Sequence, residues 1–220
     1  MANAKRNVIK NVSGKAIEAI HVTFLCTTAD GRVQSDDNGG VDKVFQYDTD
    51  HFIPSGGTYV AKVIEVGDCT ARTDAVVYAD GQVEGDADKI DLIFQRRSGA
   101  YKALSVVIPL LEDIASGQSK ASEVIATLQG NIQALSNDRS LSGEETTGEG
   151  AVFGQTINVL KFRGWLRTPS DDTPNRQPRI EDLMQTKGIS LEQAQALVTA
   201  NKYREWQSAL KDNLAPRGQY

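Results

Sequence analysis

The sequence contains few of the residues that form metal centres and nucleophilic active sites. It has two cysteines and two histidines. Cys26 and Cys69 match neither a zinc-binding spacing nor a disulfide-rich scaffold. A serine-nucleophile motif of the G-x-S-x-G type and a phosphate-binding loop are both absent. The sequence therefore predicts no cofactor and favours a protein that is not an enzyme.

Long apolar runs and an excess of positive charge are also missing. No stretch approaches the roughly 18 apolar residues of a membrane span, and the basic first ten residues lack the apolar run of a signal peptide. The 24 basic and 29 acidic residues give a net charge of −5, which disfavours nucleic acid and anionic lipid as partners. Hydrophobic residues at 40% and charged residues at 24% predict a folded globular chain without a membrane span.

The acidic residues change type along the chain. Residues 1–98 contain 12 Asp and 3 Glu, whereas Glu is common afterwards. Asp favours turns and Glu favours helix surfaces, so the change predicts an α+β protein. We expect an N-terminal immunoglobulin-like antiparallel β-sandwich followed by a C-terminal α-helical region. The predicted parts are the sandwich at 1–97, a helical hairpin on or beside it at 98–139, a flexible linker at 140–153 and a helical tail at 154–220.

Short segments bounded by Gly, Pro and Asp predict the strands of the sandwich. Alternating apolar residues in 16–26 predict a half-buried strand whose exposed face carries His21 and Thr23. Asp80-Gly81 predicts a hairpin turn. The strands are predicted at 7–12, 16–26, 44–47, 59–66, 73–79, 82–84 and 89–95, and the segment 34–41 is predicted to be a polar loop.

Apolar residues at helical spacing predict the elements of the second half. Pro109 predicts either a kink or a strand that ends at Ile108 before a helix begins. Ser190 and Gln193 predict a capping box at the start of the last helix. The helices are predicted at 100–115, 119–135, 155–166, 180–187 and 190–213, with a flexible acidic linker at 140–150 and a surface position for Arg96 and Arg97.

Two short patterns resemble a known group of proteins. The first is Asn11-Val-Ser-Gly-Lys-Ala-Ile17, and the second is Ala75-Val-Val-Tyr-Ala-Asp-Gly-Gln-Val-Glu-Gly-Asp86, followed by a basic pair and a Leu-rich helix. Together they resemble uncharacterised bacterial proteins, frequent in acidobacteria, in which an immunoglobulin-like sandwich precedes helices. The resemblance covers about residues 7–111. It implies a sandwich and an exported protein, and it implies no known reaction.

The acidic loops of the first half offer two candidate sites. His51 follows the carboxylate of Asp48, an arrangement that suits either a metal-assisted hydrolase or a solvated loop. Asp86, Asp88 and Asp91 offer oxygen ligands for Ca²⁺, although their spacing differs from that of an EF-hand. Ordinary turn chemistry is the alternative for these three aspartates.

The two cysteines and four aromatic residues leave alternatives open. Cys26 and Cys69 are equally consistent with a disulfide, which implies an oxidising compartment, and with two separate thiols. Asn11-Val12-Ser13 matches the glycosylation sequon, which matters only in a secretory host. Two aromatic pairs at helical spacing form either core or anchors for a protein partner. These pairs are Phe162 with Trp165, and Tyr203 with Trp206.

These features predict a non-enzymatic binding or structural protein that acts through protein–protein contacts or self-association. An exposed edge strand of the sandwich is one surface that such a protein uses for pairing. The predicted location is the cell envelope or the extracellular space, with the cytoplasm as the alternative. The competing functions are a metal-assisted hydrolase built around His51 and an intracellular adaptor.

Overall fold

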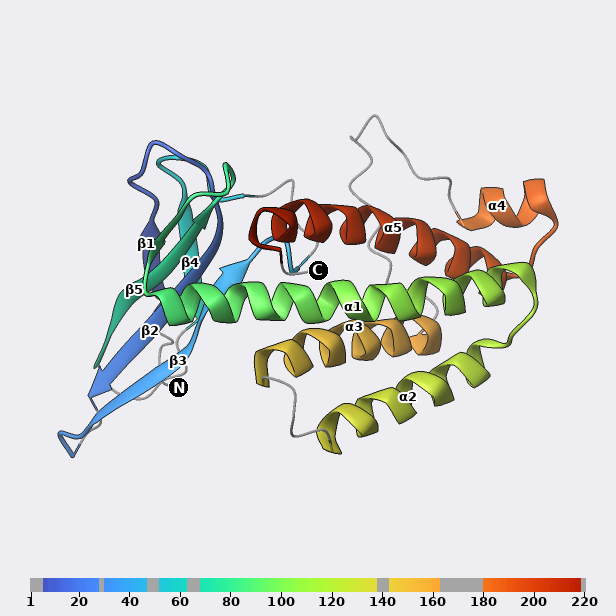
Figure 1. Cartoon of the computed structure of the whole chain (residues 1–220), viewed down its shortest axis with the longest axis horizontal. Helices are drawn as coiled ribbons and strands as arrows, with labels where there is room; N and C mark the ends of the chain where they lie inside the picture. The colour runs from blue at the N-terminus through green and yellow to red at the C-terminus, as the bar shows by residue number, and fades with distance from the viewer. Residues whose placement is uncertain are drawn as a thin grey trace. The chain divides into compact units, whose positions relative to one another are not determined.

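The structure is a computed structural model that describes residues 6–27, 30–46, 52–62, 68–137, 143–162 and 180–218. The chain divides into two units, Met1–Phe94 and Gln95–Tyr220, which we call the β unit and the helical unit. The boundary falls inside one continuous helix, α1 (Ala87–Ser116) (Figure 1). Across the described residues the chain is a mixed α and β protein with five α-helices and two antiparallel sheets.

The β unit contains a small sheet and a larger one. The small sheet pairs β1 (Arg6–Lys10) with β4 (Thr58–Lys62). The larger sheet has the order β3 (Val33–Asp42), β2 (Ile17–Thr27), β5 (Asp68–Tyr78) and β6 (Val83–Gly85). Residues of both sheets share one core, in which each fully buried large apolar side chain contributes about 1.5–3 kcal/mol. Ile9 and Tyr59 of the small sheet are partly buried against this core, whose buried members are Ile17, Ile20, Val22, Phe24, Cys26, Val41, Ile53 and Tyr78.

Several predicted strands are confirmed. β1 and β2 lie close to the predicted ranges 7–12 and 16–26. β5 and β6 form the predicted hairpin around Asp80 and Gly81, where Gly81 takes the positive φ of +81° that this turn requires. The alternation of apolar side chains and the turn residues were therefore sufficient to locate these elements.

The prediction of a polar loop at 34–41 is wrong. These residues form most of β3. Its polar residues pair with β2, from Val33 opposite Thr27 to Asp42 opposite Ala19. Gly40 explains why this segment fits so closely against β2. A Cβ atom on Gly40 would lie 2.3 Å from the backbone oxygen of Ile20, so only glycine allows this approach.

The strand predicted at 44–47 is also wrong, because residues 43–46 form a turn. Asp42 organises the turn: its carboxylate accepts a hydrogen bond from the backbone N–H of Phe45 (3.0 Å), and its carbonyl accepts one from Gln46 (2.9 Å). Short acidic side chains favour this local bonding over a strand ladder. Tyr47 lies outside the described residues.

The segment 89–95 was predicted to be a strand and is instead the beginning of α1. Asp86 caps the helix, since its Oδ1 accepts hydrogen bonds from the backbone N–H groups of Asp88 (2.9 Å) and Lys89 (3.3 Å). Ile90 and Phe94 are buried one turn apart. The short apolar run in this segment is compatible with the two-residue period of a strand and with the 3.6-residue period of a helix. The cap at Asp86 favours the helix.

The helical unit matches the predicted helices more closely. α2 (Ala121–Asn137), α4 (Ile180–Lys187) and α5 (Leu191–Leu214) lie within two residues of their predicted bounds. The capping box of Ser190 and Gln193 is present at the start of α5. A short 3-10 helix, η2 (Ala215–Arg217), follows α5. Clear apolar periodicity and a recognisable cap made these helices predictable.

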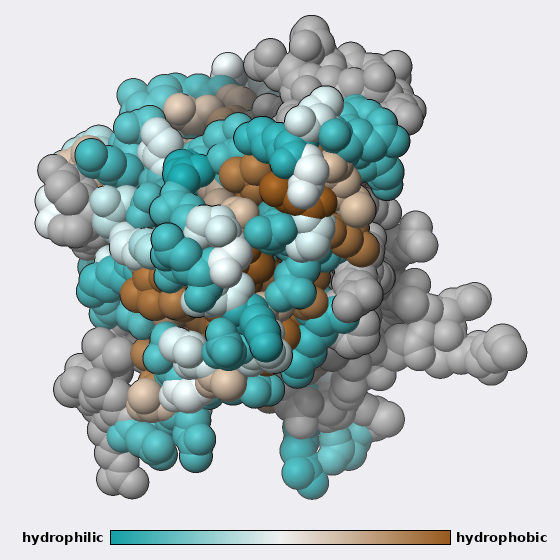
Figure 2. Space-filling model, turned by 90° about the vertical axis from the view of Figure 1, so that its right-hand side faces the viewer, coloured by the Kyte–Doolittle hydropathy of each residue, from teal (hydrophilic) through white to brown (hydrophobic). Residues whose placement is uncertain are grey.

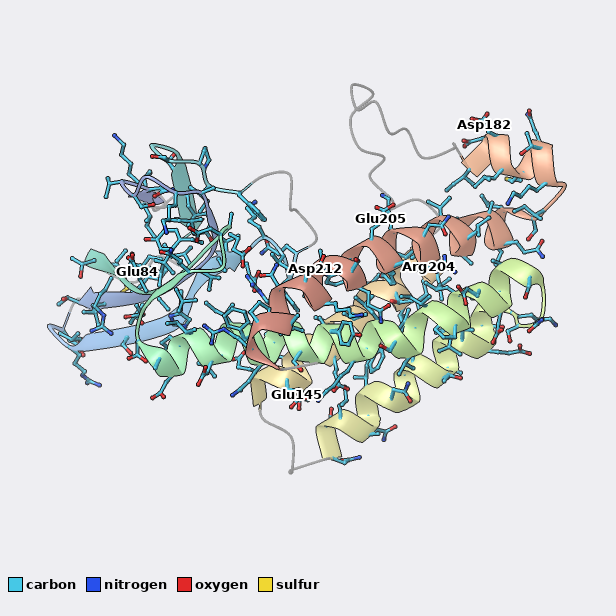
Figure 3. All side chains as sticks on the ribbon, turned by 45° about the horizontal axis from the view of Figure 1, so that its top comes forward. Glu84, Glu145, Asp182, Arg204, Glu205 and Asp212 are labelled. Carbon is cyan, nitrogen blue, oxygen red and sulfur yellow. A yellow bond between two sulfur atoms is a disulfide. The ribbon has the colours of Figure 1, made fainter. Side chains whose placement is uncertain are left out.

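The acidic segment 140–150 was predicted to be a flexible linker, but α3 (Gly143–Phe162) begins within it. Two ion pairs connect this helix to α1: Arg96 with Glu144, and Lys102 with Glu145. Figure 3 labels Glu145 on α3. The charges that suggest a solvated linker thus form contacts between helices in the helical unit. No local pattern in 140–150 reveals these partners, which lie more than 40 residues earlier in the sequence.

One of the two alternatives at Pro109 is wrong, because α1 continues through the proline and no strand ends at Ile108. The proline ring lies on the exposed side, where the lost N–H is least costly. The predicted surface position of Arg97 is also wrong. Arg97 is fully buried rather than on the surface, and its Nη1 donates a hydrogen bond of 2.8 Å to Asn213 Oδ1 on α5. A buried guanidinium requires such partners.

The hairpin of α4 and α5 has a small apolar cluster of its own. Leu183, Ala194 and Val198 are buried there, and Ile180 and Met184 are partly buried against them. Apolar side chains remain visible among hydrophilic ones on the face of the molecule shown in Figure 2. An eight-residue helix such as α4 is too short to be stable alone, so its packing on α5 holds it in place.

Candidate functional site

One cluster of polar side chains lies on neighbouring strands of the larger sheet, centred on Asp74 of β5. Asp74 Oδ2 accepts a hydrogen bond from the Thr23 hydroxyl and lies 3.2 Å from His21 Nδ1. Asp74 Oδ1 accepts a hydrogen bond of 2.7 Å from Arg72 Nε. The Asp74 side chain is only 4% exposed. The cluster thus joins a carboxylate, an imidazole, a hydroxyl and a guanidinium.

A β-bulge brings these four side chains together. In the pairing of β2 with β5, His21 lies opposite Ala75 and Val22 lies opposite Thr73, so Asp74 is the extra residue on β5. Bulges of this kind redirect a side chain relative to the regular alternation of a strand. The backbone oxygen of Asp74 also accepts a hydrogen bond of 2.8 Å from the N–H of Asp86. Both the side chain and the backbone of Asp74 are therefore fixed.

The electrostatic balance keeps Asp74 ionised. Burial of the carboxyl group tends to raise its pKa, but hydrogen bonds from Thr23, Arg72 and His21, together with the positive charge of Arg72, lower the pKa of Asp74 below its usual value. A buried carboxylate with several donors is a satisfied anion. The cluster consequently stabilises the junction of β2 and β5.

The arrangement does not form a nucleophilic triad. The Thr23 hydroxyl donates to the Asp74 carboxylate directly, whereas in a nucleophilic triad a histidine lies between the hydroxyl and the carboxylate. The face of β2 that carries Thr23 was predicted to be exposed, but Thr23 is 3% exposed and His21 is half-buried. The prediction was wrong because the residues on both faces of β2 are largely buried.

The three aspartates predicted as calcium ligands lie at the start of α1, where they cap the helix or lie on its first turns. Asp86 caps α1, and Asp88 lies in the first turn of that helix, where a negative charge interacts favourably with the helix dipole. Asp91 is exposed on the same helix. Among the described residues, no group of three or more His, Cys, Asp and Glu side chains is arranged to hold a metal ion. His51 and Asp48 lie outside the described residues.

The aromatic residues predicted as partner anchors fall into two groups. Tyr203 and Trp206 are 4% and 2% exposed, and their rings pack edge to face with centroids 5.8 Å apart. They are therefore buried in the helical unit, which favours the core alternative over the partner-anchor alternative for this pair. Phe162 is the last residue of α3 and its side chain is not described, while Trp165 lies outside the described residues.

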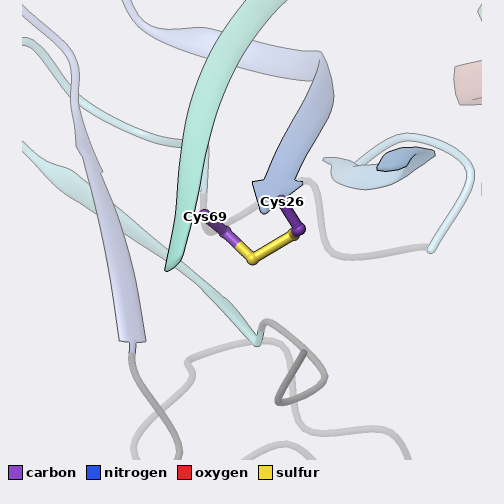
Figure 4. Close-up of a disulfide and its surroundings, with 2 residues drawn as sticks. All are labelled: Cys26 and Cys69. Atoms are coloured by element: carbon purple, nitrogen blue, oxygen red, sulfur yellow. A yellow bond between two sulfur atoms is a disulfide. The ribbon is translucent and has the colours of Figure 1, made fainter. Parts of the chain in front are cut away.

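Cys26 and Cys69 form a disulfide with an S–S distance of 2.06 Å (Figure 4). The two residues lie directly opposite each other in the pairing of β2 with β5. Cys26 is buried in the core, whereas Cys69 is half-buried. The bond thus links the second-last residue of β2 to the second residue of β5.

One edge of the larger sheet is open beside the disulfide. β6 pairs only with Ala75, Val76 and Val77 of β5. Along residues 70–73, β5 pairs with β2 on one side, and none of the described strands pairs with its other side. The side chains of residues 70–73 are exposed. An open edge of this type leaves backbone N–H and C=O groups available to another strand.

No family model, curated protein or solved structure matches the chain. In the described ranges, no helix has the length and apolar content needed to cross a membrane. The function is therefore inferred from the chain's own residues. The two features that distinguish the β unit are the Asp74 cluster and the open edge of β5.

Asn11 has a structural role that the sequence alone did not reveal. Its Nδ2 contacts three backbone carbonyl oxygens, those of Lys15 (2.8 Å), Ile53 (3.0 Å) and Pro54 (3.0 Å), and its Oδ1 accepts from the N–H of Ser13 (3.0 Å). Asn11 is 3% exposed. In the folded chain its amide is therefore occupied by turn contacts rather than available as a glycosylation site. The motif that begins at Asn11 is turn chemistry, as its Ser-Gly pair suggests.

Proposed function

We propose that the protein is a non-enzymatic assembly protein whose β unit pairs with a second copy of the chain through the open edge of β5. The observation that carries the proposal is the stretch at residues 70–73, where β5 pairs with β2 on one side and none of the described strands pairs with its other side. Edge strands recruit other strands because their backbone groups need hydrogen-bond partners.

The side chains along this edge support strand addition. Thr70, Ala71 and Thr73 are small, exposed and compatible with a strand, and Arg72 is held in its ion pair with Asp74. Edges that are protected against pairing carry charged side chains, prolines or bulges, and Thr70 and Ala71 carry none of these. A second strand therefore meets no bulky or charged barrier at Thr70 and Ala71.

Two-fold symmetry gives a specific register for the pair. Antiparallel pairing about Ala71, which lies within this stretch, places Ala71 opposite Ala71 of the second copy. Thr70 then lies opposite Arg72 of the second copy, and the two arginines are not directly opposed. A pair limited to this stretch has a small interface, so we expect weak and concentration-dependent association.

The remaining expectations belong to the same proposal. Two antiparallel sheets that share one core support an immunoglobulin-like sandwich. The disulfide supports a location in an oxidising compartment, such as the cell envelope or the extracellular space. The patterns that begin at Asn11 and Ala75 support kinship with the acidobacterial sandwich proteins, because the structure gives both patterns turn and strand roles.

Sedimentation equilibrium of the full oxidised chain over a range of concentrations tests the proposal. We expect a reversible monomer–dimer equilibrium that Ala71→Lys abolishes, because it brings two lysines together at the symmetry axis. Ala151→Lys makes the same substitution at an exposed position of α3 and serves as the matched control. A wild-type chain that remains monomeric at every concentration, or an Ala71→Lys chain that dimerises as wild type does, rules out this interface.

A further inference from the structure

One buried side chain of the helical unit lacks a hydrogen-bond partner among the described residues. Gln195 of α5 is only 6% exposed. Its amide offers two N–H groups and one carbonyl oxygen, and no donor or acceptor in the described part of the chain bonds them. The other buried polar residues each have a side-chain hydrogen bond or another polar contact. Gln195 therefore departs from the general pairing of buried polar groups.

The hydroxyl of Thr199 lies one helical turn further along α5. Thr199 is 0% exposed, and its hydroxyl donates a hydrogen bond of 2.8 Å to the backbone oxygen of Gln195. That bond uses the only hydroxyl proton, and no donor from the described residues reaches the lone pairs of the hydroxyl oxygen. Residues four apart on a helix have Cβ atoms about 5–6 Å apart. The amide of Gln195 and the acceptor of Thr199 are therefore held at a separation that one water molecule bridges.

The surroundings of these two side chains suit water and exclude larger molecules. Ala194, Ala196 and Ala200 of α5 are 0% exposed, so protein atoms pack closely around this part of the helix. A buried amide without a partner destabilises a fold. Folded proteins hold roughly one buried water per 27 residues, and each such water bonds polar groups that the protein itself does not pair.

We propose that the helical unit binds one structural water molecule between Gln195 and Thr199. The water accepts a hydrogen bond from Nε2 of Gln195 and donates one to Oγ1 of Thr199. This site gives a reason for two polar side chains in residues 194–200, where the other buried residues are alanine and valine. It makes no use of the β5 edge, so it does not depend on the proposed pairing.

Water-selective NMR of the full oxidised chain, with 15N in its glutamine side chains, tests the proposal directly. The Gln195→Met variant identifies the side-chain amide resonances of Gln195 by their disappearance. We expect these amide protons to show a cross-relaxation peak with water, and the sign of the peak in the rotating frame distinguishes a bound water from proton exchange. Thr199→Val removes the hydroxyl group at nearly the same shape and should abolish the peak.

A double-mutant cycle supplies the second readout. The side chains of Gln195 and Thr199 form no hydrogen bond with each other, so an energetic coupling between them indicates a bridge. We expect Thr199→Val to lower the urea midpoint about twice as much in the wild-type chain as in the Gln195→Met chain. Gln207→Met is the matched control on α5, because Nε2 of Gln207 donates a hydrogen bond of 2.8 Å to Ser105 Oγ. Its effect should simply add to that of Thr199→Val.

The two readouts decide the proposal together. A water peak at Gln195 that disappears in Thr199→Val, with coupled midpoint shifts, supports the site. The absence of a water peak at Gln195, a peak that persists unchanged in Thr199→Val, or additive midpoint shifts overturn it. Thr199→Ser keeps the hydroxyl group and should keep the peak, which separates loss of the acceptor from a general disturbance of α5.

Discussion

Gly148 on α3 lies so close to Arg96 on α1 that a Cβ atom on the glycine would be 2.1 Å from the arginine carbonyl oxygen. The contact is reciprocal, because a Cβ atom on Gly99 of α1 would lie 2.1 Å from the carbonyl oxygen of Glu145 on α3. The backbones of the two helices therefore meet directly. The ion pair of Arg96 with Glu144 lies next to this crossing.

Gly148→Ala should destabilise the helical unit, because the added methyl group meets backbone atoms that cannot rotate away. Overpacking of this kind costs about 1–3 kcal/mol in the free energy of unfolding. Gly154→Ala is the matched control on the same helix, since no atom lies within 4 Å of its added Cβ. It should stabilise the protein by about 0.5–1 kcal/mol through helix propensity. Urea denaturation of both variants measures the difference, and equal effects would contradict a close crossing.

The same crossing shows what the sequence could and could not predict. α5 was located because its apolar spacing and its Ser190–Gln193 box are local signals. The first half of α3 was missed, although a helix was predicted from residue 155, because the residues that hold its first turns lie on another helix. Its glycines also suggest flexibility unless their close neighbours are known. Long-range contact, rather than local propensity, decides such a segment.

The candidate site was hidden for a similar reason. His21 and Asp74 lie 53 positions apart in the sequence, and a bulge brings Asp74 to His21. Period-two alternation assigns each strand residue to a face but does not locate a bulge. The open edge of β5 is equally invisible in the sequence, because it depends on where β6 stops pairing. The disulfide was identified as one of two alternatives, and only the strand register distinguishes them.

Asp74→Asn should destabilise the β unit by about 2–3 kcal/mol at neutral pH, because charge-assisted hydrogen bonds from Arg72 and its neighbours are lost. The pKa of Asp74 is lower in the folded chain than its usual value. Its stabilising contribution is therefore present above the unfolded pKa near 4 and is lost as the pH falls through the lower folded pKa. The difference between wild type and variant should shrink in acid.

Urea denaturation of wild type and Asp74→Asn from pH 7 to pH 2.5 measures this convergence. Asp30→Asn is the control, because Asp30 forms an ion pair with Arg32 in which both side chains are largely exposed. Exposed pairs of this kind contribute less than about 1 kcal/mol. A gap between wild type and Asp74→Asn that stays constant down to the lowest pH would show that the charge of Asp74 does not stabilise the fold.

Asn11→Asp should destabilise the β unit by about 3 kcal/mol or more at pH 7. An aspartate has the same shape but cannot donate hydrogen bonds, so the carbonyl oxygens of Lys15, Ile53 and Pro54 would face a negative charge. Asn201→Asp makes the same substitution at an exposed position of α5 and should change stability by less than about 0.5 kcal/mol. Thermal denaturation followed by circular dichroism compares the two, and a tolerated Asn11→Asp would mean that the turn does not depend on this amide.

Trp206→Ala should destabilise the helical unit by about 3–5 kcal/mol, because it leaves a large cavity in a buried position. Leu191→Ala removes an apolar side chain that is 36% exposed and should have a much smaller effect. Denaturation gives the free energy of unfolding, and sedimentation of the same samples gives the oligomeric state. A Trp206→Ala chain that keeps its stability but loses association would restore the role of Trp206 as a partner anchor.

Tyr203→Phe should change how stability depends on alkaline pH. Burial raises the pKa of Tyr203 to about 12, against a usual value of 10.0, and the hydrogen bond with Thr156 lowers it only in part. The neutral form is therefore favoured in the folded chain. Its contribution is complete below pH 10 and is lost as the pH rises from about 10 to 12. The variant has no hydroxyl group to ionise, so its stability does not fall in this way. At neutral pH it should be less stable than wild type by about 1 kcal/mol, because it lacks the hydrogen bond with Thr156.

Urea denaturation between pH 8 and pH 11.5 distinguishes the two chains. The wild type should lose stability more steeply than Tyr203→Phe above pH 10, so that the initial deficit of the variant shrinks and then reverses. Tyr101→Phe, at a half-buried position of α1, controls for the removal of a hydroxyl group in general. Parallel curves for wild type and Tyr203→Phe would mean that the Tyr203 hydroxyl ionises as readily in the folded chain as in the unfolded one. That result would contradict the raised pKa that follows from its burial in the helical unit.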